Sequence, residues 1–141
     1  GQVAAERRRD VAFGAADAMA TAQVLAYSGA PLAGMVSFHG SLVPASAEAA
    51  AKNHAKFLIC HGAVDGFIKP EEIAAFQKSM DDGKFDYQFI SYSGAVHAFS
   101  NPAATKIGKA AGIPIAYNAA ADRRSWAHMR SFFSEIFKAK K

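Results

Sequence analysis

The sequence has almost no cysteine and no long apolar run, and both absences exclude classes of protein. Cys60 is the single cysteine in 141 residues, so no disulfide can form within the chain and nothing indicates a disulfide-stabilised secreted scaffold. No apolar stretch approaches the roughly 20 residues that a membrane span needs. The arginine-rich beginning also lacks the apolar core of a signal peptide. We therefore expect no membrane contact and a cytoplasmic location.

The sequence also lacks the arrangement of basic residues that is typical of a nucleic-acid-binding surface. The formal net charge is +4, and the basic clusters lie at residues 7–9 and 138–141. No aromatic residues alternate with either cluster, and neither belongs to a nucleic-acid-binding motif. The acidic residues and four of the histidines show no metal-ligand spacing; these histidines are His39, His54, His61 and His128. We expect no nucleic-acid partner, no metal and no other cofactor.

The chain has the size and composition of one domain. A length of 141 residues is close to the commonest domain size. Half of the residues are apolar and one fifth are charged, which is ordinary for a globular protein. No repeat, low-complexity tract or linker divides the sequence, so residues 1–141 are interpreted as a single domain.

The first half of the chain predicts one helix followed by two strands. Residues 3–26 are rich in helix-forming side chains, although Gly14 interrupts the pattern. Residues 32–38 are a short apolar run bounded by proline and glycine, which favours a buried strand. Residues 41–53 predict a loop with a short helix in the alanines. Residues 55–60 are almost continuously apolar, as expected of a central parallel strand.

The second half predicts helix, strand, loop and helix. Pro70 followed by two glutamates begins a helix that ends at residues 82–83. Residues 85–91 predict a third strand, and glycines break residues 105–121 into a long loop. Asp122 is the expected N-cap of the last helix. The expected core-facing stripe of that helix is Trp126, Met129, Phe133, Ile136 and Phe137.

Strands that alternate with helices indicate an α/β fold with three parallel strands and flanking helices. In a parallel sheet the loops after the strands meet at one edge, so Asp65 and His97 are expected to lie together there. Such a carboxylate can orient an imidazole that acts as a general base. The same residues are equally consistent with an aspartate that caps its own turn and a histidine that hydrogen-bonds to it.

Four segments together resemble the dienelactone hydrolase family. Residues 61–65 read HGAVD, residues 92–99 read YSGAVHAF, residues 116–126 read AYNAAADRRSW, and residues 36–40 read VSFHG. The order and spacing agree from about residue 18 to residue 138. The resemblance implies an α/β-hydrolase fold, a small ester or lactone ligand, and cleavage by a Cys-Asp-His triad. By that resemblance Asp65 is the triad acid and His97 is the triad base.

The sequence departs from this family where the nucleophile is expected. Family members carry a Gly-x-Cys-x-Gly-Gly turn before the helix that corresponds to residues 18–26. Here residues 11–17 read VAFGAAD, with Ala12 where the cysteine would stand, and no Cys or Ser occurs before Ser28. The earlier strands and helices of the family fold also have no counterpart in the sequence. Residues 1–17 are accordingly interpreted as a divergent N-terminal helix of a truncated, partial domain.

No other residue is an obvious replacement for that nucleophile. Cys60 is expected to be buried inside a strand, where a thiol serves as a small core side chain. Ser41, Ser93 and Ser100 are expected in loops near the edge of the sheet where Asp65 and His97 lie. None of them lies in a Gly-x-Ser-x-Gly turn. A serine without such a turn and a base is unreactive.

Two functions follow, and both involve a partner. The edge of residues 32–38 would be bare without the nucleophile strand, so we expect a homodimer to cover it. The first function is that of a hydrolase-like domain that has lost its nucleophile and is inactive, or is repurposed as a dimeric binding or structural module. The alternative is an ester or lactone hydrolase in which Asp65 and His97 work with a nucleophile from another subunit or chain.

Overall fold

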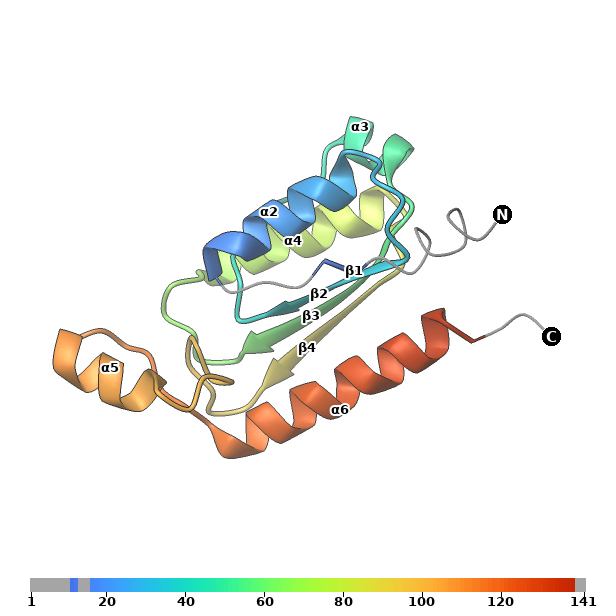
Figure 1. Ribbon diagram of the computed structural model, residues 1–141. Coiled ribbons are helices and arrows are strands. Elements are labelled where there is room, and N and C mark those ends of the chain that lie inside the picture. Colours follow the sequence, from blue (N-terminus) through green and yellow to red (C-terminus); the bar gives the residue numbers. More distant parts are fainter. Residues whose placement is uncertain (1–10, 13–15, 139–141) are drawn as a thin grey trace.

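The computed structural model describes residues 11–12 and 16–138 and shows one parallel sheet with helices on both faces (Figure 1). The strands lie in the order β1-β2-β3-β4 and all pair in parallel. They are β1 (Val11–Ala12), β2 (Gly34–Phe38), β3 (Lys56–Gly62) and β4 (Tyr87–Tyr92). The helices are α2 (Ala16–Tyr27), α3 (Ala47–Lys52), α4 (Pro70–Asp82), α5 (Ala104–Ala111) and α6 (Ala119–Ile136).

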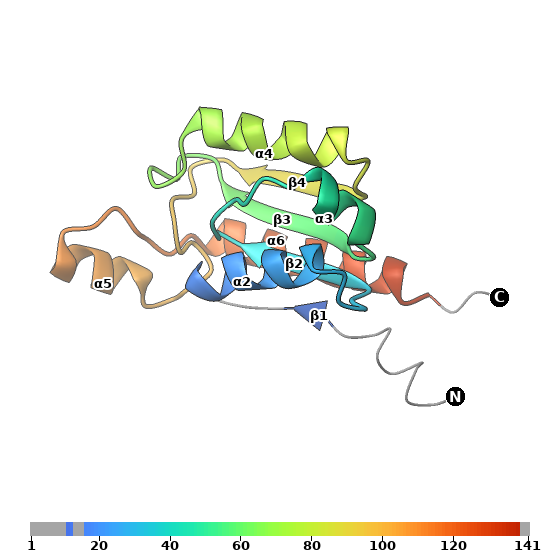
Figure 2. The ribbon, with the colours of Figure 1, turned by 90° about the horizontal axis from the view of Figure 1, so that it is seen from above.

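The helices form two unequal layers around the sheet. Helices α2 and α4 lie on one face, α6 covers the other, and α5 extends beyond the end to which the strand arrows point (Figures 1 and 2). Three of the strands are those expected from the sequence, with β3 between β2 and β4. Among the described residues, no helix is long and apolar enough to cross a membrane.

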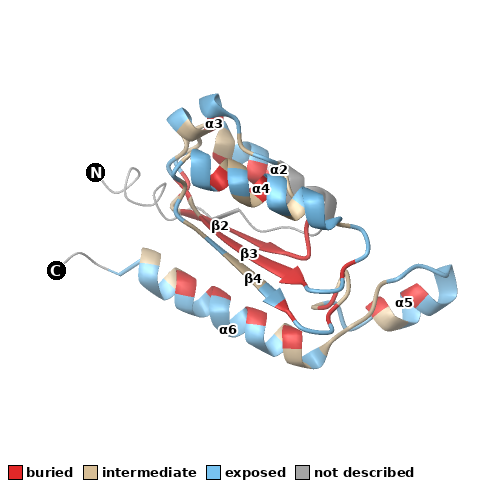
Figure 3. Ribbon diagram, turned by 180° about the vertical axis from the view of Figure 1, so that it is seen from behind, coloured by how far each residue is buried: buried red, intermediate tan, exposed pale blue. Residues whose placement is uncertain are grey.

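Burial on both faces explains why β3 is almost continuously apolar (Figure 3). Phe57 and Ile59 belong to the core under α2 and α4, and Leu58 and Cys60 belong to the core under α6. All four are at most 1% exposed. Successive side chains of a strand point to opposite faces, so one strand contributes to both cores. This rigid central strand carries the turn that bears Asp65.

Helix α4 begins and ends where the sequence predicts. Pro70 occupies the first turn, and the carboxylate of Glu72 accepts the backbone N–H of Lys69 at 2.8 Å. Phe76 and Met80 are fully buried against the sheet. The short helix in the alanines is also present as α3, with Ser46 as its N-cap.

The expectation of a helix over residues 3–26 is wrong at residues 11–12 and is confirmed from Ala16 onward. Residues 3–10 and 13–15 lie outside the described residues, Val11–Ala12 is a strand, and the helix begins at Ala16. Val11 and Ala12 pair with Gly34 and Met35, because sheet hydrogen bonds outweigh the helix propensity of alanine. The same pairing corrects the expectation that β2 has a bare edge, since β1 covers its first two residues.

The expected loop over residues 105–121 is also partly wrong, because it contains α5. Gly108 does not break this helix, since the helix packs closely against the segment that follows. A side chain at Gly108 would collide with the carbonyl oxygens of Ile113 and Ile115. Gly112, at φ +66°, ends the helix.

The N-cap of α6 is Asn118 and not Asp122. The side-chain oxygen of Asn118 accepts the N–H of Ala121 at 3.0 Å, whereas Asp122 lies inside the first turn and accepts the hydroxyl of Tyr117 at 2.8 Å. The helix therefore begins one turn earlier than expected. The expected stripe is correspondingly wrong at Trp126 and Phe137, which are exposed. The buried residues are Ala121, Ser125, Met129 and Phe132.

Candidate active site

Asp65 and His97 meet where the strands end. Asp65 lies in the turn after β3, and His97 lies in the loop after β4, so the parallel arrangement brings them to one edge. Nδ1 of His97 lies 2.9 Å from Oδ2 of Asp65. The Asp65 side chain is fully buried, while that of His97 remains 17% exposed. The two residues that the sequence singled out are therefore in contact, and the histidine is accessible from outside.

Hydrogen bonds determine the charge of Asp65 and thereby the tautomer of His97. Burial alone would raise the pKa of Asp65, but the hydrogen bonds from His97 and from the backbone N–H of Phe67 outweigh it and lower that pKa. An ionised carboxylate can only accept hydrogen bonds, so Nδ1 of His97 is the donor. Nε2 is then left as the basic nitrogen, which is the arrangement that a general base requires.

A close contact between two loops positions His97. The N–H groups of Ala63 and Val64 donate to the carbonyls of Tyr92 and Ala95, each at 3.0 Å. Gly62 permits this contact, because a Cβ there would lie 2.6 Å from the Ala95 oxygen. This close approach explains why a glycine follows His61 in the HGAVD segment.

Residues 115–118 also hold the loop that bears His97. His97 forms an isolated parallel bridge with Ile115, and its carbonyl accepts the N–H of Ala116 at 3.3 Å. The N–H of Asn118 donates to the carbonyl of Phe99 at 2.9 Å. The AYN residues at 116–118 thus fix the backbone around His97 immediately before α6 begins.

His39 lies beside the site, although the sequence indicates no role for it there: it is part of the VSFHG segment and shows no metal-ligand spacing. It follows β2, and its ring centroid lies 5.5 Å from that of His97 and 5.1 Å from that of Phe99. Its Nε2 lies 2.8 Å from Oγ of Ser100. Its position after a parallel strand is the same signal that identified Asp65 and could have identified His39 as well.

The contact with His39 does not activate Ser100 as a nucleophile. Burial, assisted by the nearby His97, lowers the pKa of His39 to about 4, so the imidazolium that a base must become is strongly disfavoured. No described residue lies at hydrogen-bonding distance from its buried Nδ1, and the nearby charge of Asp65 does not offset the effect of burial, so the imidazolium would lack a carboxylate partner. Nε2 accepts the Ser100 hydroxyl or donates to it, but without this support the contact cannot activate the serine.

The other candidates that the sequence offered, Cys60, Ser41 and Ser93, are also unsuited as nucleophiles. Cys60 is fully buried on the α6 side of the sheet, where burial raises the pKa of its thiol to about 11. Ser41 and Ser93 are exposed, and no described base lies at hydrogen-bonding distance from either hydroxyl. Val11–Ala12 and α2 do reproduce the strand-to-helix order of a nucleophile turn. However, residues 12–15 are Ala, Phe, Gly and Ala.

His61 lies close enough to Asp65 and His97 to act on them electrostatically, but it and His128 have their own side-chain contacts. The buried ring of His61 packs on Phe89 with centroids 5.4 Å apart, and Nδ1 of His128 lies 2.7 Å from the hydroxyl of Tyr92. Within residues 11–12 and 16–138, no three His, Cys, Asp or Glu side chains are grouped as metal ligands.

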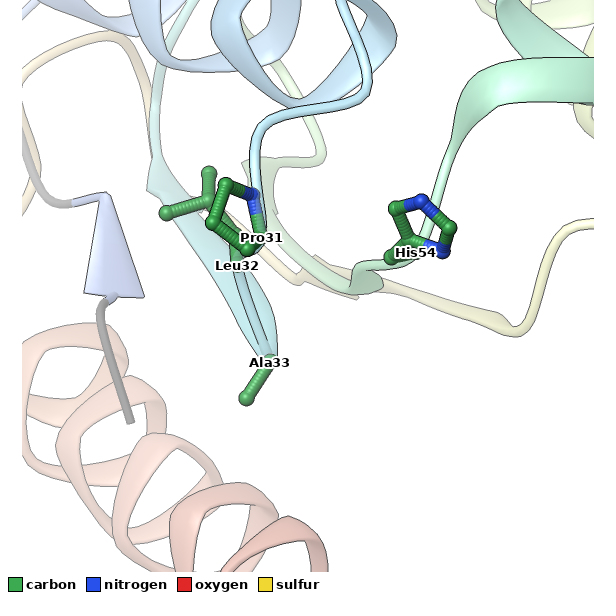
Figure 4. Close-up of a pocket in the computed structure, with 4 residues that line it drawn as sticks. All are labelled: Pro31, Leu32, Ala33 and His54. Atoms are coloured by element: carbon green, nitrogen blue, oxygen red, sulfur yellow. The ribbon is translucent and has the colours of Figure 1, made fainter. Parts of the chain in front are cut away.

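One hollow of the surface lies away from this site. It measures about 420 Å³ and is lined by Pro31, Leu32, Ala33 and His54 (Figure 4). These residues precede β2 and β3, so the hollow is at the opposite end of the strands from Asp65 and His97. His54 has no carboxylate partner at hydrogen-bonding distance among the described residues, and the hollow therefore does not extend the candidate active site.

Comparisons with known proteins show which sequences are similar to this chain. The model of the dienelactone hydrolase family matches residues 13–137. An uncharacterized protein of Caenorhabditis elegans is 30% identical over 106 residues, which cover 73% of this chain and 64% of that protein.

Solved structures are similar as well. The dienelactone hydrolase-like promiscuous phosphotriesterase P91 from metagenomic libraries is 38% identical, with a TM-score of 0.80 over 89% of this chain and 52% of that one. The structure named m3DLH is 37% identical, with a TM-score of 0.83 over 93% of this chain and 53% of that one. A putative dienelactone hydrolase from Klebsiella pneumoniae is 19% identical and has the same fold at a TM-score of 0.62, covering 80% of this chain and 46% of that one. The chain thus spans about half the length of these structures.

Proposed function

Because this chain belongs to the dienelactone hydrolase family, we propose that it carries the acid and base of an ester- or lactone-hydrolase site without the nucleophile. The observation that carries this proposal is the 2.9 Å contact between Nδ1 of His97 and the buried Asp65 carboxylate. The carboxylate orients the ring and would stabilise its protonated form.

The absence of a suitable thiol or hydroxyl supports inactivity of the chain alone. The position of the family cysteine falls at residues 12–15, none of which has a nucleophilic side chain. Cys60 faces the α6 core, and Ser100 contacts a histidine that burial keeps neutral. A base without a nucleophile cannot begin acyl transfer. The chain would then serve as a binding or structural module, with a small ester or lactone as its ligand class.

The partial exposure of His97 favours one alternative, in which a nucleophile comes from another subunit or chain. Nε2 of His97 would take the proton of an incoming thiol or hydroxyl as its sulfur or oxygen bonds to the acyl carbon. The same proton would then pass to the leaving alcohol. General-base assistance of this kind contributes roughly 10²–10⁴-fold to a rate.

An assay with and without an added thiol tests both functions. The release of p-nitrophenol would be measured from p-nitrophenyl acetate, and also from diethyl p-nitrophenyl phosphate because P91 is a phosphotriesterase. Without thiol, the wild type and His97→Ala should show the same background rate. With 2-mercaptoethanol as the supplied nucleophile, the wild type should exceed His97→Ala by roughly 100-fold, the lower end of general-base assistance, if the base is functional.

His54→Ala is the matched control, because His54 lies at the opposite end of the strands. This variant should follow the wild type under every condition. A rate without thiol that depends on His97 would contradict the missing nucleophile. Equal rates with thiol in the wild type and His97→Ala would exclude the alternative and leave the binding module.

A further inference from the structure

We infer that His39 and Ser100 form a clamp that positions His97, an inference that rests on the proposed role of His97 as the base. The hydrogen bond between Nε2 of His39 and Oγ of Ser100, 2.8 Å long, joins the end of β2 to the loop after β4. It crosses the end of β3, where Asp65 lies. We call these two residues the His39–Ser100 clamp.

The ring of His39 packs against two rings in the loop after β4, those of His97 and Phe99. Its centroid is 5.5 Å from that of His97 at an interplanar angle of 64°, and 5.1 Å from that of Phe99 at 84°. Both are edge-to-face arrangements, which aromatic pairs favour. The hydrogen bond to Ser100 prevents rotation of the His39 ring, so the surface on which His97 rests is fixed.

Backbone strain lies at one residue of the clamp, His39, and two residues before the other, Ser100. His39 has φ +46°, and Ala98, between His97 and Phe99, has φ +61°. Side chains other than glycine disfavour this left-handed region, and such residues persist where the surroundings impose them. Of the described residues, the only other non-glycine with positive φ is Lys84. The strain is therefore concentrated where the two loops contact each other.

Packing alone does not explain a histidine at this position. His39 is 9% exposed, and its Nδ1 has no hydrogen-bond partner among the described residues. A buried polar atom without a partner is destabilising, and an apolar ring of similar shape would avoid that cost. What the imidazole adds to an apolar ring is the bond of Nε2 to Ser100.

The experiment is to follow the Nδ1–H proton of His97 by NMR in the isotopically labelled full chain. This proton lies in the hydrogen bond to Asp65 and reports ring position without any catalytic activity. In Ser100→Ala its exchange with solvent should become about five- to tenfold faster, the scale of one lost neutral hydrogen bond. Ser100→Thr keeps the hydroxyl and should restore the wild-type rate. His39→Gln removes the ring and should accelerate the exchange at least as much.

Ser93→Ala is the matched control, since Ser93 is an exposed serine of the same loop. Its exchange rate should equal that of the wild type, and the melting temperature would be measured for every variant. Wild-type exchange in Ser100→Ala would overturn the clamp. So would faster exchange that Ser100→Thr does not restore. If the ester assay with thiol shows no role for His97 but its exchange still depends on Ser100, the role of His97 as a base fails, the binding module remains, and the clamp stands.

Discussion

Two buried side chains at the candidate site respond to acid in different ranges. The pKa of Asp65 is lowered, because hydrogen bonds from His97 and Phe67 outweigh the effect of burial. The pKa of His39 is lowered to about 4, chiefly by burial. For both groups the unfolded chain takes up protons at a higher pH than the folded chain. Their contributions to stability are therefore present at neutral pH and are lost on acidification.

The His39 contribution predicts a loss of stability in mild acid. Unfolded His39 gains a proton near pH 6.5, whereas folded His39 remains neutral down to about pH 4. Between these values the free energy of unfolding should fall by roughly 3 kcal/mol at most from this residue. Denaturant unfolding from pH 7 to pH 4 should show a shallower loss in His39→Gln than in the wild type.

Burial also lowers the pKa of the buried His61, so His61 too destabilises the fold in mild acid. It does so in both the wild type and His39→Gln, and the difference between them still reports His39. The contribution of the Asp65 carboxyl itself falls in a lower range and should be lost only in stronger acid, as the pH falls below the unfolded pKa of Asp65, near 3.8. Parallel curves for His39→Gln and the wild type between pH 6.5 and 4 would contradict the burial of a neutral His39.

At the scale of elements, the site depends on how the loops after β2, β3 and β4 contact one another. The strands place these loops at one edge, and close backbone contacts determine their relative positions. The tightest is at Gly62, the last residue of β3, where a Cβ would lie 2.6 Å and 2.8 Å from the carbonyl oxygens of Ala95 and Val96. Real Cβ atoms essentially never come so close to a neighbour, so the His97 loop would have to move.

Gly62→Ala should therefore displace His97 from Asp65. We expect it to lower the free energy of unfolding by about 1–3 kcal/mol, as overpacking generally does, and to abolish the protected Nδ1–H signal of His97. Gly66 is the matched control, because it lies in the turn after β3, where an added Cβ would meet no atom within 4 Å. Gly66→Ala should keep both the stability and the signal. Equal behaviour of the two variants would contradict the steric role of Gly62.

At the scale of the whole molecule, the chain spans about half the length of the structures that it resembles. Among the described residues the sheet ends on one side at β1, which pairs with β2 at two residues. Apolar side chains are exposed on the helices of both faces, with Val24 and Leu25 on α2 and Trp126 on α6. The Trp126 ring packs beside Phe38 of β2. Exposed apolar side chains near a short edge strand are a feature of sheets that pair with a partner.

We accordingly propose that two copies of the chain associate through this side of the sheet. Size-exclusion chromatography with light scattering at micromolar concentration should give twice the mass of one chain. Trp126→Glu should shift the chain toward the monomer, because it places a charge in the interface. Val64→Glu is the control, since Val64 is 57% exposed but follows β3. A monomeric wild type would contradict the dimer.

Local patterns were sufficient for much of the fold. Helix α4 was predictable from Pro70 and its glutamates, and β3 from its apolar run, because both signals lie within one element. Predictions failed where distant contacts overrode local preference. Val11–Ala12 is a strand because β2 provides its partners, and α5 continues through Gly108 because a later segment packs against it.

For the site, the sequence by itself determined which residues could provide the chemistry. Strand order and family motifs together identified Asp65 and His97, because the ends of parallel strands share one edge. Only the tertiary structure decided that Nδ1 of His97 lies 2.9 Å from Asp65 and that His39 contacts Ser100, 61 residues away. Contacts over such separations depend on the packing of whole elements. Burial then lowers the pKa of His39, which leaves His97 as the candidate base.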